Sequence, residues 1–348
     1  MSQTSPQWGP DILGPDYQAL VLTVPARPGP GAQNGPVPEG SWRATLVRHR
    51  RQRPAQNQPS PAQPTAAPAQ RAPVLFIHGW SDYFYNTGLA EFFTGLGHPF
   101  YALDLHNHGR SLQSLELGGY VADLADYYDE ILAAQAVIAR EHGAPEPADV
   151  PIILAGHSTG GLIAALWSKR FPHLVSQLIL NSPWLEMQGG AAIRRAAAPL
   201  VHFADLRPLM RMRVPERSFY WRGISDEALG EWPVDQGMRP PRAFPVRAGW
   251  MKAILAAQQE VAAGLALPMP VLVLLSTKSM LGPVWSDHML RADVVLDVRS
   301  LALRTLSLGN SVTLERIDGA LHEVFLSRGP VRAEAYLRLA RWLRGYAP

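Results

Sequence analysis

The sequence contains no cysteine among its 348 residues, and this absence excludes several kinds of site together. Without thiols the chain has no disulfide bonds, no zinc–thiolate centre and no cysteine nucleophile. A lack of disulfides is typical of proteins kept in a reducing compartment, so we expect a cytoplasmic protein.

Long apolar runs and a strong net charge are missing as well. No apolar run approaches the ~20 residues of a membrane span, so we expect no integral membrane association. Residues 1–6 have neither a basic start nor an apolar stretch, which argues against a signal peptide. The formal net charge of +3 is small for this length, and the tryptophans do not interleave with a basic stripe, so we expect no nucleic-acid partner.

The stretch Ile152–Ala155 is a short apolar run that leads directly into Gly-His-Ser-Thr-Gly, and a small-residue helical pattern follows. This strand, turn and helix is the context of a G-x-S-x-G nucleophile elbow with Ser158 as the nucleophile. Gly156 and Gly160 leave room where neighbouring backbones pass close to the sharp turn. The alternative is a glycine-rich corner in which the serine is accidental.

Strands alternate with helices along most of the chain, which predicts an α/β fold with a mostly parallel central sheet covered by helices on both faces. The expected strands are Tyr17–Val24, Ser41–Val47, Pro73–Ile77, Phe100–Leu103, the run before Ser158, Gln177–Asn181, Val271–Leu275 and Val312–Ile317. The expected helices are Asn86–Leu96, one beginning near Tyr120, one ending near Arg170, Leu296–Leu306, and a last one with Tyr336, Leu339, Ala340 and Leu343 on one face.

The alternation fails between residues 184 and 267, a stretch rich in tryptophan, arginine and proline. We interpret it as an inserted helical cap, which divides the α/β core into residues 1–183 and 268–348. An ordinary helical subdomain without a role in substrate binding is the alternative. Residues 52–72 consist mainly of Pro, Ala and Gln and predict a flexible loop, since they offer little apolar surface to offset the entropy of ordering.

A serine hydroxyl needs a base to remove its proton, and in this fold the base follows the last strand. His322 stands there, directly after Val312–Ile317. The carboxylate that orients the histidine must lie between the serine and the histidine in the chain, and Asp287, Asp293 and Asp297 are the candidates. We favour Asp293, and we expect Asp297 to cap the next helix.

An oxyanion hole needs two backbone N–H donors, and we expect them from Thr159 and Trp80. Thr159 directly follows the nucleophile, and Trp80 follows His78-Gly79 at the end of a strand. The residues expected to line the substrate pocket are Trp80, Tyr83, His157 and Trp184.

His106-Asn107-His108 has the spacing of a pair of metal ligands, but no further ligand pattern follows it. We therefore expect no metal and no cofactor.

Five segments together resemble the α/β-hydrolase superfamily, in its branch of monoacylglycerol lipases, lysophospholipases and serine aminopeptidases. They are HGW at 78–80, DLHNHGRS at 104–111, GHSTGG at 156–161, DVVLD at 293–297 and GALH at 319–322. The resemblance implies a catalytic triad of Ser158, Asp293 and His322. The long segment 276–292 departs from the short turn that the family usually has before the acid.

The expected activity is that of a cofactor-free serine hydrolase acting on a small-molecule carboxylic ester, such as a monoacylglycerol or a lysophospholipid, through an acyl-enzyme. A peptidase or amidase of the serine-aminopeptidase type is the alternative within enzymes. Such an enzyme needs acidic groups to hold a free amine, whereas residues 194–222 are rich in arginine. A non-catalytic ligand-binding protein on the same scaffold is the alternative outside enzymes.

Overall fold

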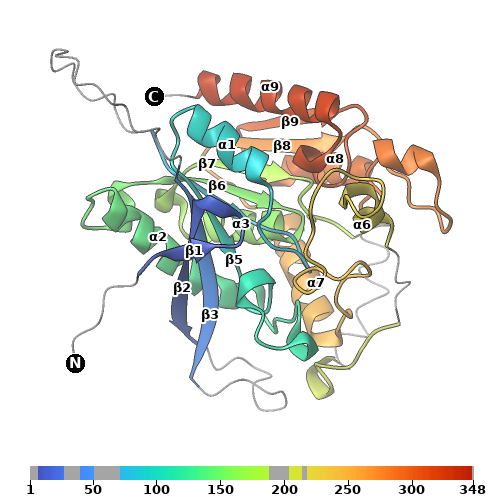
Figure 1. Cartoon of the computed structure of the whole chain (residues 1–348), viewed down its shortest axis with the longest axis horizontal. Helices are drawn as coiled ribbons and strands as arrows, with labels where there is room; N and C mark the ends of the chain where they lie inside the picture. Colours follow the sequence, from blue (N-terminus) through green and yellow to red (C-terminus); the bar gives the residue numbers. More distant parts are fainter. Residues whose placement is uncertain (1–6, 27–39, 51–70, 188–203, 214–217, 347–348) are drawn as a thin grey trace.

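The computed structural model describes residues 7–26, 40–50, 71–187, 204–213 and 218–346, and these form one mixed sheet with helices on both sides (Figure 1). The sheet has the strand order β1-β2-β3-β5-β4-β6-β7-β8-β9. The strands are β1 (Gly9–Asp11), β2 (Gly14–Pro25), β3 (Ser41–His49), β4 (Val74–Ile77), β5 (Phe100–Asp104), β6 (Ile152–His157), β7 (Val175–Asn181), β8 (Val271–Ser276) and β9 (Val312–Ile317).

Neighbouring strands are parallel in the part of the sheet with the order β5-β4-β6-β7-β8-β9. The neighbours in the part with the order β1-β2-β3-β5 are antiparallel. Every residue of β4, β6 and β8 is buried, as expected of strands covered on both faces. The predicted α/β class, the mostly parallel sheet and the positions of these strands are confirmed.

Helices cover the two faces of the sheet as separate layers (Figure 1). One layer holds α1 (Thr87–Gly95) and α9 (Gly329–Gly345), and the other holds α2 (Tyr128–Glu141), α3 (Thr159–Arg170), α7 (Ala248–Ala262) and α8 (Val298–Arg304). Within the described ranges, no helix has the length and apolarity that crossing a bilayer would require.

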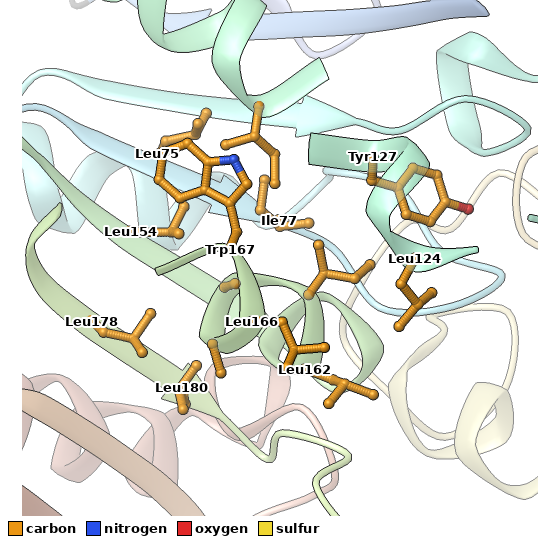
Figure 2. Close-up of a cluster of buried hydrophobic side chains, with 14 of the residues drawn as sticks. Leu75, Ile77, Leu124, Tyr127, Leu154, Leu162, Leu166, Trp167, Leu178 and Leu180 are labelled. Atoms are coloured by element: carbon orange, nitrogen blue, oxygen red, sulfur yellow. The ribbon is translucent and has the colours of Figure 1, made fainter. Parts of the chain in front are cut away.

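The larger core cluster lies between the sheet and the layer of α2 and α3 (Figure 2). Trp167 of α3 is fully buried there, beside side chains that alternate strand residues direct to this face. Those labelled in Figure 2 from the strands are Leu75, Ile77, Leu154, Leu178 and Leu180. This packing fixes α3, and therefore the turn at its first residue, against the sheet.

Two predicted helices have different bounds. α2 begins at Tyr128 rather than near Tyr120, because the Asp123 side chain accepts a hydrogen bond from the Ala125 amide and starts a 3-10 turn over Leu124–Tyr127 first. α8 is shorter than predicted and starts at Val298, where the Asp297 side chain caps it by accepting from the Arg299 amide.

The predicted cap is only partly within the described residues, which omit 188–203 and 214–217. Its helix α6 (Phe219–Ile224) is short. The longer helix α7 belongs to the layer on the sheet, since Trp250, Ile254 and Val261 join the larger core cluster. Residues 52–70 of the predicted flexible loop also lie outside the described part of the chain.

Candidate active site

Ser158 lies at the turn between β6 and α3 with φ of 52° and ψ of −116°, a conformation that costs energy for a residue with a side chain. The neighbouring glycines allow this turn. A Cβ on Gly156 would lie 2.5 Å from the Gly160 carbonyl oxygen, and one on Gly160 would lie 2.2 Å from the His78 carbonyl oxygen. The strand, turn and helix expected around this serine are therefore present.

His322 lies in the loop after β9, and its two ring nitrogens contact the two predicted partners. Its Nε2 is 3.0 Å from Ser158 Oγ, and its Nδ1 is 2.9 Å from Asp293 Oδ2. All three residues are buried. With the hydroxyl donating to Nε2 and the Nδ1–H donating to the carboxylate, this is the arrangement that general-base activation of a serine requires.

Asp293 is held by its second oxygen and by its backbone. Its Oδ1 accepts hydrogen bonds from the Val295 and Leu296 amides, at 2.7 and 2.8 Å. Its own amide donates to the Lys278 carbonyl at 2.9 Å, and its carbonyl accepts from the Met280 amide at 2.7 Å. The long segment 276–292 thus leaves the end of β8 and returns to it, which carries the acid back to the histidine.

The other two candidate acids have different contacts. Asp297 caps α8, as expected from the sequence. Asp287 accepts from the Trp285 indole N–H at 3.2 Å at the start of a 3-10 turn. Of the three, it is Asp293 that the fold brings to His322.

The loop after β4 passes directly beside the nucleophile. A Cβ on Gly79 would lie 2.9 Å from His157 Nδ1 and 3.3 Å from Ser158 Cβ, so only glycine lets the backbone come this close. The Trp80 amide follows this glycine. Thr159 is the first residue of α3, where amides have no partner within the helix. Thr159 is thus adjacent to Ser158 in the chain, and Trp80 follows the glycine that passes beside Ser158.

Three tryptophans pack against one another near the turn that carries the nucleophile. The ring of Trp250 in α7 contacts the other two. Its centroid lies 4.4 Å from that of Trp80, on which it stacks, and 5.8 Å from that of Trp184. The Trp80 indole N–H donates to the Gly119 carbonyl at 2.9 Å, which fixes the ring. The Trp184 amide donates to the Ser158 carbonyl at 2.9 Å. Trp80 and Trp184 are thus next to the turn that carries the serine.

Tyr83 and His157, the other two residues expected at the substrate, are buried supports. The Tyr83 hydroxyl accepts from the Asp235 amide at 2.9 Å, and burial raises the pKa of this phenol to about 12. The His157 ring lies 4.9 Å from the His322 ring. Burial is the main cause that keeps the pKa of His157 well below its usual range, and the nearby His322 adds to it, so His157 is neutral.

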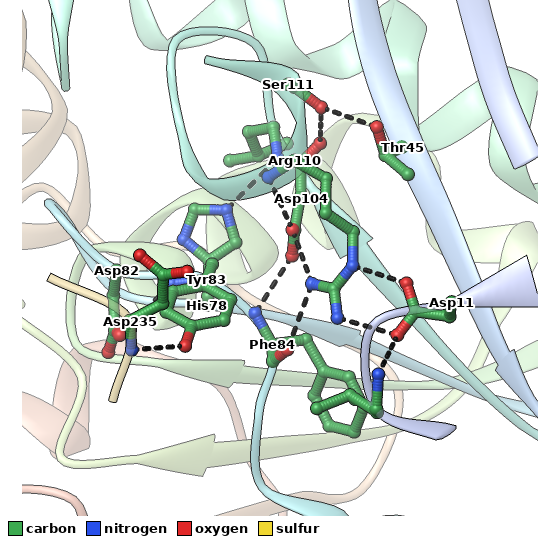
Figure 3. Close-up of polar contacts among 12 residues, drawn as sticks. Asp11, Thr45, His78, Asp82, Tyr83, Phe84, Asp104, Arg110, Ser111 and Asp235 are labelled. Atoms are coloured by element: carbon green, nitrogen blue, oxygen red, sulfur yellow. Dashed lines mark hydrogen bonds and ion pairs between the residues drawn. The ribbon is translucent and has the colours of Figure 1, made fainter. Parts of the chain in front are cut away.

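The segment 104–111 braces the loop after β4 (Figure 3). Asp104 accepts from the Phe84 amide at 2.8 Å and from the Arg110 guanidinium at 2.7 Å. The Leu105 amide donates to His78 Nε2 at 3.0 Å, so the loop that leads to Trp80 is tied to the end of β5. Ser111 Oγ donates to the Asp104 carbonyl at 2.8 Å.

Several buried polar residues near the site were not among the predicted site residues. Asp82 pairs with Arg239 at 3.1 Å, and the Tyr220 ring lies edge-on to His322 at 5.3 Å. Asn181 and Glu323 hydrogen-bond to each other. The position of Asn181 at the end of a predicted strand and of Glu323 beside His322 could have drawn attention to them, whereas nothing in the sequence marks Arg239.

The two histidines with the spacing of metal ligands have protein partners. His106 Nδ1 pairs with Glu130, and His108 Nδ1 donates to the His106 carbonyl at 2.9 Å. In the parts of the chain that the structure describes, no three His, Asp or Glu side chains gather as a metal site requires.

The family model described as serine aminopeptidase, S33 matches residues 68–327. A monoacylglycerol lipase of Mycolicibacterium smegmatis is 25% identical over 263 residues, which are 73% of this chain and 82% of that protein. The phospholipase YtpA of Bacillus subtilis is 32% identical over 120 residues, which are 34% of this chain and 42% of that protein.

Solved structures share the fold. A soluble variant of monoglyceride lipase from Saccharomyces cerevisiae, in complex with a substrate analog, superposes with a TM-score of 0.59 at 14% identity, and the match covers 99% of this chain and 97% of that one. Since the family model spans well over half of the sequence, this chain belongs to the serine aminopeptidase S33 family of the α/β-hydrolase superfamily, in the branch that resembles monoacylglycerol lipases.

Proposed function

We propose that this protein is a serine hydrolase that cleaves carboxylic esters of lipophilic acyl groups, in the class of monoacylglycerols and lysophospholipids, through an acyl-enzyme. The observation that carries the proposal is the placement of His322 between Ser158 Oγ and Asp293 Oδ2. The lipolytic relatives support the ester class.

In the first half of the reaction, Ser158 Oγ attacks the ester carbonyl while His322 Nε2 takes the hydroxyl proton. Asp293 holds the Nδ1–H tautomer and stabilises the imidazolium that forms. The amides of Trp80 and Thr159 would donate to the oxyanion, and the N-terminus of α3 adds its positive dipole. His322 then gives the proton to the leaving alcohol, which departs.

In the second half, His322 removes a proton from water, and the hydroxide attacks the acyl-enzyme carbonyl. Collapse of this second tetrahedral intermediate breaks the bond to Ser158 Oγ, and the proton on His322 returns to that oxygen. The fatty acid is released and the starting enzyme is restored. The partly exposed rings of Trp80 and Trp184 would offer apolar surface to the acyl group, and the buried Trp250 packs against both of them.

Peptide-bond cleavage from a free N-terminus is the competing activity, because the matched family model bears that name. It would need a carboxylate free to bind an ammonium group. Among the described residues near His322, Asp82 is paired with Arg239, and Glu323 is engaged by Asn181. Burial also raises the pKa of Glu323 to about 8, so this carboxyl is neutral at pH 7. The ester reaction is therefore favoured.

The test is labelling with a fluorophosphonate, followed by intact mass, on the wild type and on Ser158→Ala. A single adduct on the wild type and none on the variant is the expected result. p-Nitrophenyl esters of increasing acyl length and aminoacyl p-nitroanilides then separate the two activities. Faster release from the anilides would reject the ester proposal, and absence of both labelling and turnover would reject the serine mechanism.

A further inference from the structure

Asn181, the last residue of β7, contacts both the nucleophile turn and the loop of the base. Its backbone carbonyl accepts from the Ser158 amide at 3.0 Å. Its side-chain oxygen accepts from the Val324 amide at 3.1 Å, and its side-chain nitrogen donates to Glu323 Oε1. Asn181 is buried, so these hydrogen bonds are shielded from water. One residue thus connects the backbone of Ser158 to the two residues that follow His322.

Glu323 holds the same loop from the other side. Its Oε1 also accepts from the Phe325 amide at 2.8 Å, and this contact caps the 3-10 turn Val324–Leu326. The side chain is buried, and burial raises its pKa to about 8. At neutral pH it is therefore a neutral acid with an oxygen that accepts two hydrogen bonds.

Burial is the main cause of the raised pKa of Glu323, and the hydrogen bonds from the Phe325 amide and Asn181 offset it only in part. The negative charge of Asp82 acts on Glu323 from the loop after β4, and the phenols of Tyr85, Tyr220 and Tyr336 lie within its electrostatic range. Arg239 is directed to Asp82, and no ion pair joins it to Glu323 among the described residues. The neutral form of Glu323 is thus the one that fits its surroundings.

We propose that Asn181 and Glu323 are positioning residues, which together hold His322 at hydrogen-bond distance from Ser158. The inference rests on the proposed function, because it assigns a role in the reaction of that site. Neither residue contacts the reacting atoms. Their effect is on the geometry of the Nε2–Oγ contact, where a displacement of about 1 Å can cost a rate up to about 100-fold.

The experiment measures kcat and KM for a p-nitrophenyl ester between pH 6 and 9, fluorophosphonate labelling rates and thermal unfolding. The variants are Asn181→Ala, Asn181→Asp, Glu323→Gln and Glu323→Ala. The matched control is Gln135→Ala, which removes another buried amide, one that donates to the Leu174 carbonyl at 3.2 Å from α2.

We expect Asn181→Ala to lower kcat and the labelling rate by about 10- to 100-fold with KM changed by less than about threefold. Glu323→Gln should retain near wild-type kcat at pH 7, because an amide oxygen can accept the same two hydrogen bonds, whereas Glu323→Ala should not. Asn181→Asp keeps the acceptor for Val324 but places a second carboxyl beside Glu323. Its kcat should therefore fall more steeply with rising pH than that of the wild type.

A folded Asn181→Ala with wild-type kcat would overturn the inference, and so would a Glu323→Gln as slow as Glu323→Ala. An equal loss of kcat in Gln135→Ala would also overturn it, because the effect would then be general destabilisation. If Asn181→Ala does not fold, the pH dependence of kcat in the nearly isosteric Asn181→Asp tests the inference instead. A pH dependence equal to that of the wild type would overturn it. A wild type that is neither labelled nor active would reject the proposed function itself, whereas failure of these variants alone would leave that function standing.

Discussion

Asp293 illustrates how one side chain uses its two oxygens for different tasks. Oδ1 is engaged by two backbone amides, which fix the carboxylate plane. Oδ2 is left to accept from His322 Nδ1. The orientation of the imidazole therefore depends on Oδ2. If an amide nitrogen stood in the place of Oδ2, its N–H group would face the Nδ1–H of His322, and two donors would meet without an acceptor.

We predict that Asp293→Asn lowers kcat/KM for ester hydrolysis by about 10³- to 10⁴-fold, because the amide favours the wrong histidine tautomer. Asp297→Asn is the control, since Asp297 caps α8 and does not contact the histidine. Its activity should remain within about twofold of the wild type, a margin expected for a site outside the reaction. A larger loss in Asp297→Asn than in Asp293→Asn would contradict the assignment of the acid.

Glu323 makes stability depend on pH. Its pKa rises from 4.5 in the free side chain to about 8 in the folded protein, mainly because of burial. The folded state therefore holds a proton that the unfolded state releases above pH 4.5. The contribution of Glu323 to the free energy of unfolding is fully present below pH 4.5 and is lost as the pH rises through 8.

We predict that the free energy of unfolding of the wild type falls relative to Glu323→Gln by about 1.4 kcal/mol per pH unit between pH 5 and 8. Urea unfolding of both proteins at one-unit pH steps measures this difference directly. Parallel curves for the two proteins would show that Glu323 is ionised in the folded state.

At the scale of elements, the turn from β6 to α3 depends on the absence of two side chains. Gly160→Ala should destabilise the fold by about 3 kcal/mol or more, since its Cβ would overlap the backbone oxygens of Ile77 and His78 at 2.5 and 2.2 Å. Gly95→Ala at the end of α1 is the control, because nothing lies within 4 Å of its Cβ position. Differential scanning calorimetry compares them, and equal melting temperatures would refute the packing argument.

Arg110 joins distant elements through its guanidinium (Figure 3). Its Nε and Nη2 donate to Asp11 of β1 at 2.6 and 2.9 Å, and Nη1 donates to Asp104 of β5 at 2.7 Å. The three side chains are almost completely shielded from water.

Arg110→Met should therefore cost about 3–5 kcal/mol in urea unfolding, because it leaves two buried carboxylates unpaired. Arg338→Met, which removes partly exposed pairs with Glu315 and Glu334, should cost at most about 1 kcal/mol. A similar cost for both variants would indicate that the Arg110 network is not a main source of stability.

At the scale of the whole molecule, the parallel sheet ends in an antiparallel extension. β2 pairs with β3 from Tyr17–His49 to Pro25–Ser41, and Tyr17, Leu20 and Leu22 are buried. Removing β1 and β2 would expose both an edge strand and apolar surface.

We predict that a chain starting at residue 40 is recovered mainly as aggregate, whereas one starting at residue 7, which keeps all described strands, remains soluble and active. Size-exclusion chromatography and ester turnover distinguish them. A monomeric, active shorter chain would show that the extension is dispensable.

Much of the fold was predictable because its signals are local. The predicted strand Val312–Ile317 coincides with the observed β9, since Val312 and Leu314 alternate with polar residues as on a half-buried strand. The start of α2 was predicted too early, because the spacing of Val121 and Leu124 resembles a helix while the Asp123 cap imposes a 3-10 turn. Local patterns predict an element better than its first residue.

The sequence by itself determined the elbow around Ser158 and the position of His322 after the last strand, because both are signals within a few neighbouring residues. Only the tertiary structure decided which of three aspartates meets His322, since this depends on a segment that leaves β8 and returns to it by backbone hydrogen bonds. The tertiary structure also decided that Asn181 forms a hydrogen bond with Glu323, which lies 142 positions further along the chain. Such contacts exist only when parallel strands bring their carboxyl ends to one edge of the sheet.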